Sequence, residues 1–169
     1  MRLLRASLLL SCLLASSCVL AESLRVELIL FRQAPTPTNA SHPAPDDWAV
    51  GAQAPDEKAI ARLEEIAATL VPPAGYQVLW HDSWFQETGD LVRLSDGALR
   101  YGHAPIEGTL LLHSGRFLRL DLDLWVNRFG RYDELIASEH LSHEGQVTLG
   151  KLTYLDHPSL GVLIQVSRP

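Results

Sequence analysis

Residues 117–126 read Phe-Leu-Arg-Leu-Asp-Leu-Asp-Leu-Trp-Val, the most regular pattern in the chain. Every second residue from Leu118 to Val126 is apolar, and most of the residues between them are charged. This period of two is typical of a β-strand with one face in the core and one face in water. The stretch 108–113 precedes it across the short Ser114-Gly115-Arg116 turn, so the two predict an antiparallel hairpin.

The stretch 24–32 predicts a second, more deeply buried strand. One face is apolar throughout, and the other changes from Arg25 and Glu27 to Ile29 and Phe31. We therefore expect a strand that begins half-exposed and ends buried on both faces, as an interior strand of a sheet does.

Three further stretches complete the predicted sheet. Residues 76–81 predict a strand that enters a bend at 82–86. Residues 147–154 change phase at Gly150, which predicts a β-bulge there. A turn at 156–159, set by Asp156 and Pro158, leads into a last strand at 160–167. We expect this hairpin to align Val147, Leu149, Leu152 and Tyr154 with the core residues Leu160, Val162 and Ile164.

One helix is predicted between Asp56, which could cap it, and the stop at Pro72-Pro73. Apolar residues recur at helical spacing in this stretch: Ile60, Leu63, Ile66, Ala67 and Leu70. The stretch 33–55 has five prolines and few large apolar residues, which predicts a mobile or extended loop. The fold class is therefore α+β: one domain over 22–169, with six to seven mostly antiparallel strands and one amphipathic helix packed on a face.

The N-terminus has the features of a cleavable export signal. Arg2 and Arg5 precede an apolar stretch at 6–15, which is too short to span a bilayer, and small residues lead to Ala21. We expect cleavage between Ala21 and Glu22 and a mature protein in the periplasm. Lipidation of Cys18 is the alternative, but Ala15 stands where a lipid-attachment motif usually has Leu.

Removal of this signal changes the chemistry that the chain can carry. Both cysteines, Cys12 and Cys18, are lost, which excludes thiol chemistry. Without Arg2 and Arg5, 12 of the 14 basic residues remain, and with 20 acidic residues the net charge is −8. Nucleic acid is therefore not an expected partner, because binding to phosphates depends on clustered Lys and Arg.

Two His–carboxylate pairs could hold a metal if the fold joined them: His81 with Asp82, and Asp156 with His157. Adjacent residues on a strand point to opposite faces, so each pair should offer one group at most. A second stretch, with His140 and His143, has no helical pattern and predicts a solvated loop. We expect no cofactor, because no phosphate-binding, nucleophile-elbow or zinc-protease motif is present.

Aromatic and polar residues give another candidate surface. Trp84 and Trp125 lie near hydrogen-bonding groups, including His81 and Gln86, and such combinations hold sugars or peptides. Trp80 shares the phase of its strand's apolar residues, which favours the core. The candidate contact residues are therefore Trp84, Gln86, Trp125, His81 and His157.

Several motifs together resemble the CsiV family of periplasmic peptidoglycan-binding proteins. They are the strand at 26–32, the pattern Tyr-x-Val-Leu-x-His-x-x-Trp-x-Gln at 76–86, Gly-Thr-Leu at 108–110, and the C-terminal stretch 149–163 with its Asp-His-Pro turn. The last of these is the specific one. A pair of arginines expected just before it is replaced by Glu144-Gly145-Gln146, which would weaken or move the contact with the wall's carboxylates.

The resemblance implies a non-enzymatic periplasmic protein that binds peptidoglycan and supports or regulates cell-wall synthesis. It also implies a lipoprotein partner that activates a class A penicillin-binding protein. Two alternatives remain. One is a metal-dependent hydrolase that uses His81, Asp82, Asp156 and His157. The other is a structural adaptor that offers a sheet edge to a partner protein.

Overall fold

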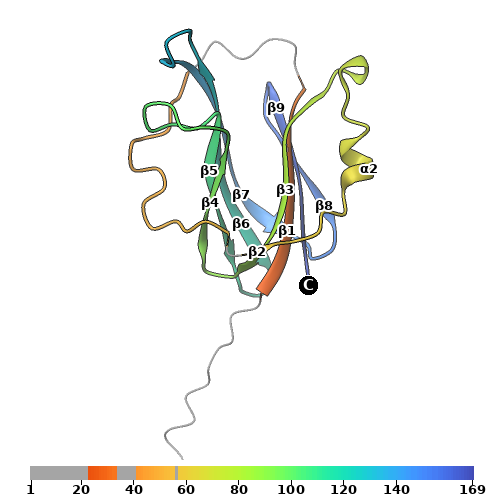
Figure 1. The fold of residues 1–169 in the computed structure, drawn as a ribbon. Helices are drawn as coiled ribbons and strands as arrows, with labels where there is room; N and C mark the ends of the chain where they lie inside the picture. Colours follow the sequence, from red (N-terminus) through yellow and green to blue (C-terminus); the bar gives the residue numbers. More distant parts are fainter. Residues whose placement is uncertain (1–22, 34–40, 56) are drawn as a thin grey trace, which may run out of the picture.

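Two antiparallel sheets face each other across one core in the computed structural model, which describes residues 23–33, 41–55 and 57–169 (Figure 1). The first sheet has the strand order β2-β3-β1-β9-β8, and the second has the order β4-β5-β6-β7. The strands are β1 (Ser23–Arg32), β2 (Glu57–Lys58), β3 (Gln77–Glu87), β4 (Leu91–Asp96), β5 (Ile106–His113), β6 (Leu118–Phe129), β7 (Leu135–Val147), β8 (Leu152–Asp156) and β9 (Leu160–Ser167).

The predicted hairpin is confirmed as β5 and β6, which pair from Ile106↔Val126 to His113↔Arg119. The alternating residues Leu120, Leu122 and Leu124 are fully buried between the two sheets. The prediction of mostly antiparallel strands is confirmed as well, although nine strands are present in the described part of the chain rather than six or seven. The period of two in the sequence was sufficient to predict these strands, because each strand of a β-sandwich buries one face.

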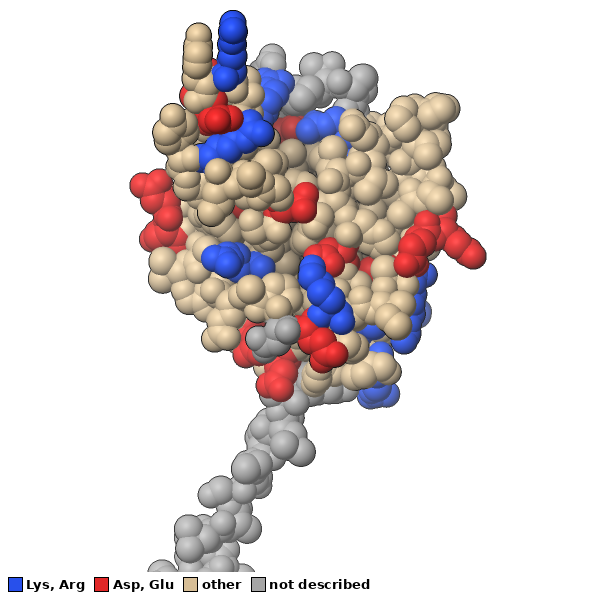
Figure 2. Space-filling view, in the orientation of Figure 1, with Lys and Arg blue, Asp and Glu red and all other residues tan. Residues whose placement is uncertain are grey.

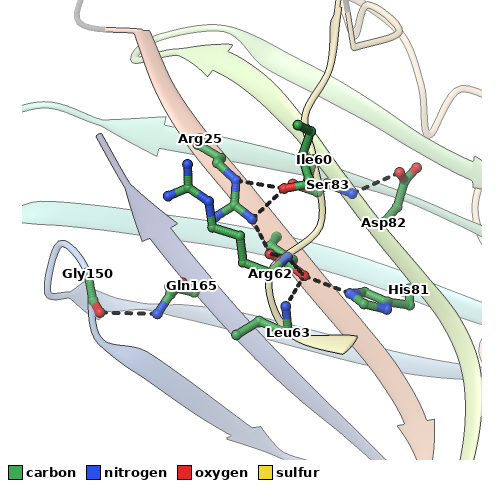
Figure 3. A network of polar contacts seen from close by, with 10 residues as sticks. Arg25, Ile60, Arg62, Leu63, His81, Asp82, Ser83, Gly150 and Gln165 are labelled. Atoms are coloured by element: carbon green, nitrogen blue, oxygen red, sulfur yellow. Dashed lines mark hydrogen bonds and ion pairs between the residues drawn. The ribbon is translucent and has the colours of Figure 1, made fainter. Parts of the chain in front are cut away.

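Strand β1 is central in its sheet, as predicted, but the expectation that it begins half-exposed is wrong. Leu24, Val26, Leu28 and Leu30 face the other sheet, and the side chains between them are buried too. Arg25 and Glu27 are covered by the segment that follows β2 (Figure 3). The charged residues at the start of β1 therefore mark a covered face rather than a solvated one.

The predicted amphipathic helix is wrong. Among the described residues of the predicted stretch, only one turn, α2 (Glu64–Ala67), is α-helical, and a 3₁₀ turn, η2 (Pro72–Ala74), follows it. Residues 57–58 pair with β3 instead, and Ile60 is 84% exposed. The backbone amides of Arg62 and Leu63 donate to the Glu27 carboxylate, and the helical turn begins only after them, at Glu64. Asp56, the expected cap, lies outside the described residues.

The apolar residues of this segment still reach the outer face of the five-stranded sheet. Leu63 is buried against Ile29 and Phe31, and the partly buried Ile66 and Leu70 pack around them. Helical spacing in the sequence thus identified the four apolar residues that pack on the sheet, although not the exposed Ile60, while tertiary contacts decided their backbone conformation.

Strand β3 continues through the predicted bend without interruption, so the bend at 82–86 is wrong. Its pairing with β1 runs from Gln77↔Arg32 to Glu87↔Ser23. Trp80 and Trp84 project to the same face and stack with ring centroids 6.3 Å apart. Asp82 pairs with Lys58 and Gln86 donates to backbone carbonyls, whereas the buried hydroxyl of Ser83 has no hydrogen-bond partner within the described ranges.

Two expectations for the C-terminal third are also wrong. Residues 139–144 belong to β7 and not to a solvated loop. Gly150, at φ +76°, lies in the turn that carries the chain from β7 in one sheet to β8 in the other, so it is not a bulge. Because the chain changes sheets there, Leu152 and Tyr154 face outward and Leu155 enters the core.

The described part of the proline-rich stretch, residues 41–55, runs along the outer side of the four-stranded sheet and is here named the strap (Figure 1). At one end the amide of His42 donates to the carbonyl of Ser138 on β7, at 3.0 Å. At the other end Gln53 pairs with β4, where its amide donates to Leu91 at 2.9 Å and its carbonyl accepts from Arg93 at 2.7 Å. The strap is therefore hydrogen-bonded to both edge strands of this sheet.

Candidate functional site

A pocket of about 180 Å³ opens at the end of the sandwich where β1 ends and β9 begins. We name it the arginine pocket. Its walls come from both sheets: Arg32 from β1, Val126, Asn127 and Arg128 from β6, and Ala137 and Glu139 from β7.

Glu139 fixes one of the two guanidinium groups. Arg32 donates to both of its carboxylate oxygens, at 3.1 and 2.7 Å, and the hydroxyl of Ser159 also donates to it. Burial alone would raise the pKa of Glu139, but the hydrogen bonds from Arg32 and Ser159 outweigh it and hold the pKa below its usual value. Glu139 is therefore an ionised partner of Arg32 that ties the two sheets together.

Arg128 is different, because it is exposed and no carboxylate within the described ranges forms an ion pair with it. The same end of the molecule carries further cations on the turn between β6 and β7 and on the loop before β5. Arg100 lies 5.0 Å from the centre of the Phe129 ring, and Arg131 lies 6.0 Å from that of Tyr132. Figure 2 shows basic side chains gathered over this end, with a few carboxylates among them.

The turn between β8 and β9 borders this pocket. The amide of Ser159 donates to Nδ1 of His157 at 3.3 Å. Burial lowers the pKa of His157, which favours the neutral imidazole near pH 7. Asp156 accepts hydrogen bonds from Gln33 at 2.8 Å and from Tyr154 at 2.7 Å, and these lower its pKa. The predicted turn at 156–159 thus lies at the end of β1 and is attached to it.

Three of the five candidate contact residues are structural. Trp84 is completely buried, and its Nε1 donates to Oε1 of Gln86 at 3.1 Å. Gln86 in turn donates to the carbonyls of Asp90 and Leu110, which joins the two sheets. Trp125 is 8% exposed and stacks flat on His140, with ring centroids 4.4 Å apart. The expectation that Trp84, Gln86 and Trp125 form an accessible surface is therefore wrong.

His81 also has a structural partner. Its Nε2 lies 2.8 Å from Oε1 of Glu27, which is fully buried and also pairs with Arg25 (Figure 3). The same carboxylate accepts the amides of Arg62 and Leu63 at 2.7 to 2.9 Å, and the carbonyl of Ile60 accepts from Arg25. This network holds the segment after β2 against the sheet. Of the candidate contact residues, His157 is linked to the arginine pocket through Ser159, which donates to Glu139.

The four residues of the hydrolase hypothesis do not converge. His81 points to the outer face toward Glu27, whereas Asp82 pairs with Lys58 in a cavity beside Trp84. Asp156 ends β8 and His157 follows it, three strand positions away from β3, which is about 14 Å across a sheet. No cluster of three or more His, Cys, Asp or Glu side chains placed to bind a metal occurs among the residues that the structure describes.

A second concave surface lies over the outer face of the four-stranded sheet, and we name it the outer groove. It measures about 490 Å³ and surrounds the turn between β5 and β6. His113, Arg116, Phe117, Arg119, Asp121 and Glu144 contribute to it. The sequence did contain a signal for Phe117: it shares the phase of Arg119 and Asp121, so an aromatic ring was to be expected on the polar face. Arg128 carried no comparable signal.

The fold and these two surfaces define a β-sandwich whose accessible polar and aromatic groups are arranged for binding. The chain belongs to the CsiV family: the sequence model of this family, described as peptidoglycan-binding protein, matches residues 53–169. The match includes β2 to β9, the outer groove and the part of the arginine pocket that β6 and β7 contribute, and it begins near the end of the strap. Arg32 on β1 precedes the matched residues. Comparison with curated proteins and with solved structures gave no significant match. No helix in the described ranges is long and apolar enough to cross a membrane.

Proposed function

We propose that this chain is exported to the periplasm, binds peptidoglycan there without catalysing a reaction, and supports or regulates cell-wall synthesis. Membership of a peptidoglycan-binding family is the observation that carries the proposal. The export signal at 1–21, which lies outside the described residues, would bring the chain to the compartment where the wall is made.

The arginine pocket suits the charged part of this ligand. The stem peptides of peptidoglycan carry free carboxylates, and a guanidinium binds a carboxylate with two parallel hydrogen bonds. Arg32 already has such a partner in Glu139, so Arg128 is the group that can accept a new one. Because the mature chain is acidic overall, attraction to an anionic polymer has to be local, and the cations around this pocket supply it.

Sedimentation with purified sacculi tests the proposal. The wild-type protein should sediment, and binding should weaken as salt is added, because an exposed charge contact is screened. Arg128→Glu should reduce the bound fraction strongly. Lys151→Glu is the matched control, since Lys151 is exposed in the turn between β7 and β8, at the opposite end of the sheet. A wild-type protein that stays in the supernatant would refute peptidoglycan binding, and equal loss in both variants would refute the role of Arg128.

The resemblance to the family further implies a protein partner, a lipoprotein that activates a class A penicillin-binding protein. This regulatory step is separable from wall binding. If this step operates, the purified wild-type chain should bind the activator in the absence of sacculi. The Arg128→Glu variant should bind it equally well. A partner that binds only when peptidoglycan is present would instead make the wall the common scaffold.

A further inference from the structure

We infer that the outer groove is a saccharide subsite that holds the glycan strand of peptidoglycan, whereas the stem peptides are held elsewhere. The inference rests on the proposed function and adds the chemical class of ligand for a surface that the family match does not resolve. Its volume of about 490 Å³ lies within the range of 300 to 1,000 Å³ that is usual for small-ligand sites.

An exposed aromatic ring forms the apolar wall of the groove. Phe117 is 54% exposed, although the strand that it precedes buries Leu120, Leu122 and Leu124. The guanidinium of Arg116 lies 5.4 Å from the centre of the ring and leaves the rest of the ring accessible. A flat apolar surface of this size beside polar groups matches a pyranose, which has one face of C–H bonds and a rim of hydroxyl groups.

The polar groups of the groove lie in two cross-strand rows on the outer face. His113, Arg119 and Gln146 are in register across β5, β6 and β7, and Asp121 and Glu144 form the next row. His113 contacts Oδ2 of Asp121 at 2.6 Å, and Arg119 pairs with Glu144. The other oxygen of Asp121, Oδ1, is shielded and has no hydrogen-bond partner within the described ranges. The accessible donors and acceptors of the groove are the half-exposed side chains of His113, Arg119 and Glu144, which can meet a sugar hydroxyl or an acetamido group.

Charge balance selects a neutral ligand for this surface. Two arginines and one histidine face two carboxylates, and most of these groups already pair with one another. An anionic stem peptide would meet no surplus of positive charge here, in contrast to the arginine pocket. A neutral amino-sugar chain requires both donors and acceptors at short intervals, and the two rows provide them.

Titration with a soluble chitin oligosaccharide, the tetramer of N-acetylglucosamine, tests this assignment in the full mature chain. Backbone NMR shifts should map to β5, β6 and the turn between them. Phe117→Ala should weaken the affinity about tenfold, and Phe117→Tyr should retain it. Tyr132→Ala is the control, because Tyr132 is equally an exposed aromatic residue but lies at the other end of the sandwich.

The outcomes separate the two levels of the argument. If wild type sediments with sacculi but gives no shifts with the tetramer, the saccharide assignment is wrong and peptidoglycan binding stands. If Phe117→Ala, shown to be folded by circular dichroism, binds the tetramer as wild type does, the assignment is also wrong. If wild type does not sediment with sacculi, the proposed function itself fails. Loss of tetramer binding in Phe117→Ala with retention in Arg128→Glu supports separate subsites.

Discussion

Gly161 on β9 lies against the ring of Phe31 on β1. A Cβ atom at position 161 would lie 2.4, 2.7 and 3.0 Å from three atoms of that ring. The ring in turn contacts Tyr76 edge-on at 5.6 Å and stacks on Tyr154 at 6.3 Å. A side chain is therefore excluded at position 161 by packing, and the aromatic cluster on the outer face depends on that space.

Gly161→Ala should destabilise the fold by about 1 to 3 kcal/mol, the usual cost of overpacking, because Phe31 is buried and cannot move without displacing its neighbours. Chemical denaturation followed by circular dichroism measures the effect. Gly115→Ala is the matched control, since a Cβ at Gly115 makes only an ordinary contact at 3.5 Å. Unchanged stability in Gly161→Ala would contradict the packing described for Phe31.

Glu27 should contribute to the acid sensitivity of the fold. Burial alone would raise the pKa of Glu27, but hydrogen bonds from His81, from the amides of Arg62 and Leu63 and from Arg25 lower it below 4.5. A carboxyl group whose pKa is lower in the folded state stabilises the fold above its unfolded pKa, and this contribution is lost as the pH falls through the folded value. Stability should therefore decrease with acidification below about pH 4.5.

Glu27→Gln removes this contribution and leaves Arg25 buried without a counter-charge. The variant should lose about 3 to 5 kcal/mol at neutral pH, the range for breaking a buried ion pair. Its denaturation free energy should also depend less steeply on pH in the acid range. Glu139 and Asp156, whose pKa values are lowered too, retain part of the slope. An acid slope identical to that of wild type would show that Glu27 does not titrate as described.

Two residues of the turn between β8 and β9 should differ in their effect on stability: Asp156 is structural and His157 is not. Asp156→Ala removes the acceptor shared by Gln33 and Tyr154 and should lower the melting temperature. His157→Ala should leave the melting temperature nearly unchanged, because the hydrogen bonds of its side chain within the described ranges are weak ones to Ser159 at 3.3 Å. Differential scanning calorimetry compares the two variants directly. A larger loss in His157→Ala than in Asp156→Ala would reverse the assignment.

The mature chain should begin at Glu22, because Ala21 completes the small-residue motif that precedes signal cleavage. Intact mass and N-terminal sequencing of exported material measure this. Attachment of a lipid at Cys18 would give a different terminus and a larger mass, and it would place the protein on a membrane rather than free in the periplasm.

Strict local periodicity was enough to predict the hairpin of β5 and β6 from the sequence. Where partners distant in sequence decided the outcome, prediction failed. The stretch after Asp56 has helical spacing, but Glu27, more than 30 residues earlier, captures the amides of Arg62 and Leu63. No local pattern contains that information, because a buried carboxylate on β1 looks like an exposed one in sequence.

The candidate site shows the same division. Trp84 and Trp125 were aromatic residues near polar ones, and only the fold shows that Trp84 is buried between the two sheets and that Trp125 is covered beside His140. Phe117 was readable as an aromatic residue in the polar phase of its strand, and it is the one that lies open to solvent. Arg128 could not be distinguished from Arg32 in the sequence, because only the structure shows that Glu139 pairs with Arg32.

The strap has a consequence for self-association. A four-stranded sheet ends in two strands with unpaired backbone groups, which can recruit another chain and start aggregation. Here one continuous segment hydrogen-bonds to both of these strands, at Ser138 and at Leu91 and Arg93. The chain thus covers part of each edge strand of this sheet with its own backbone. This arrangement disfavours polymerisation of the protein through that sheet.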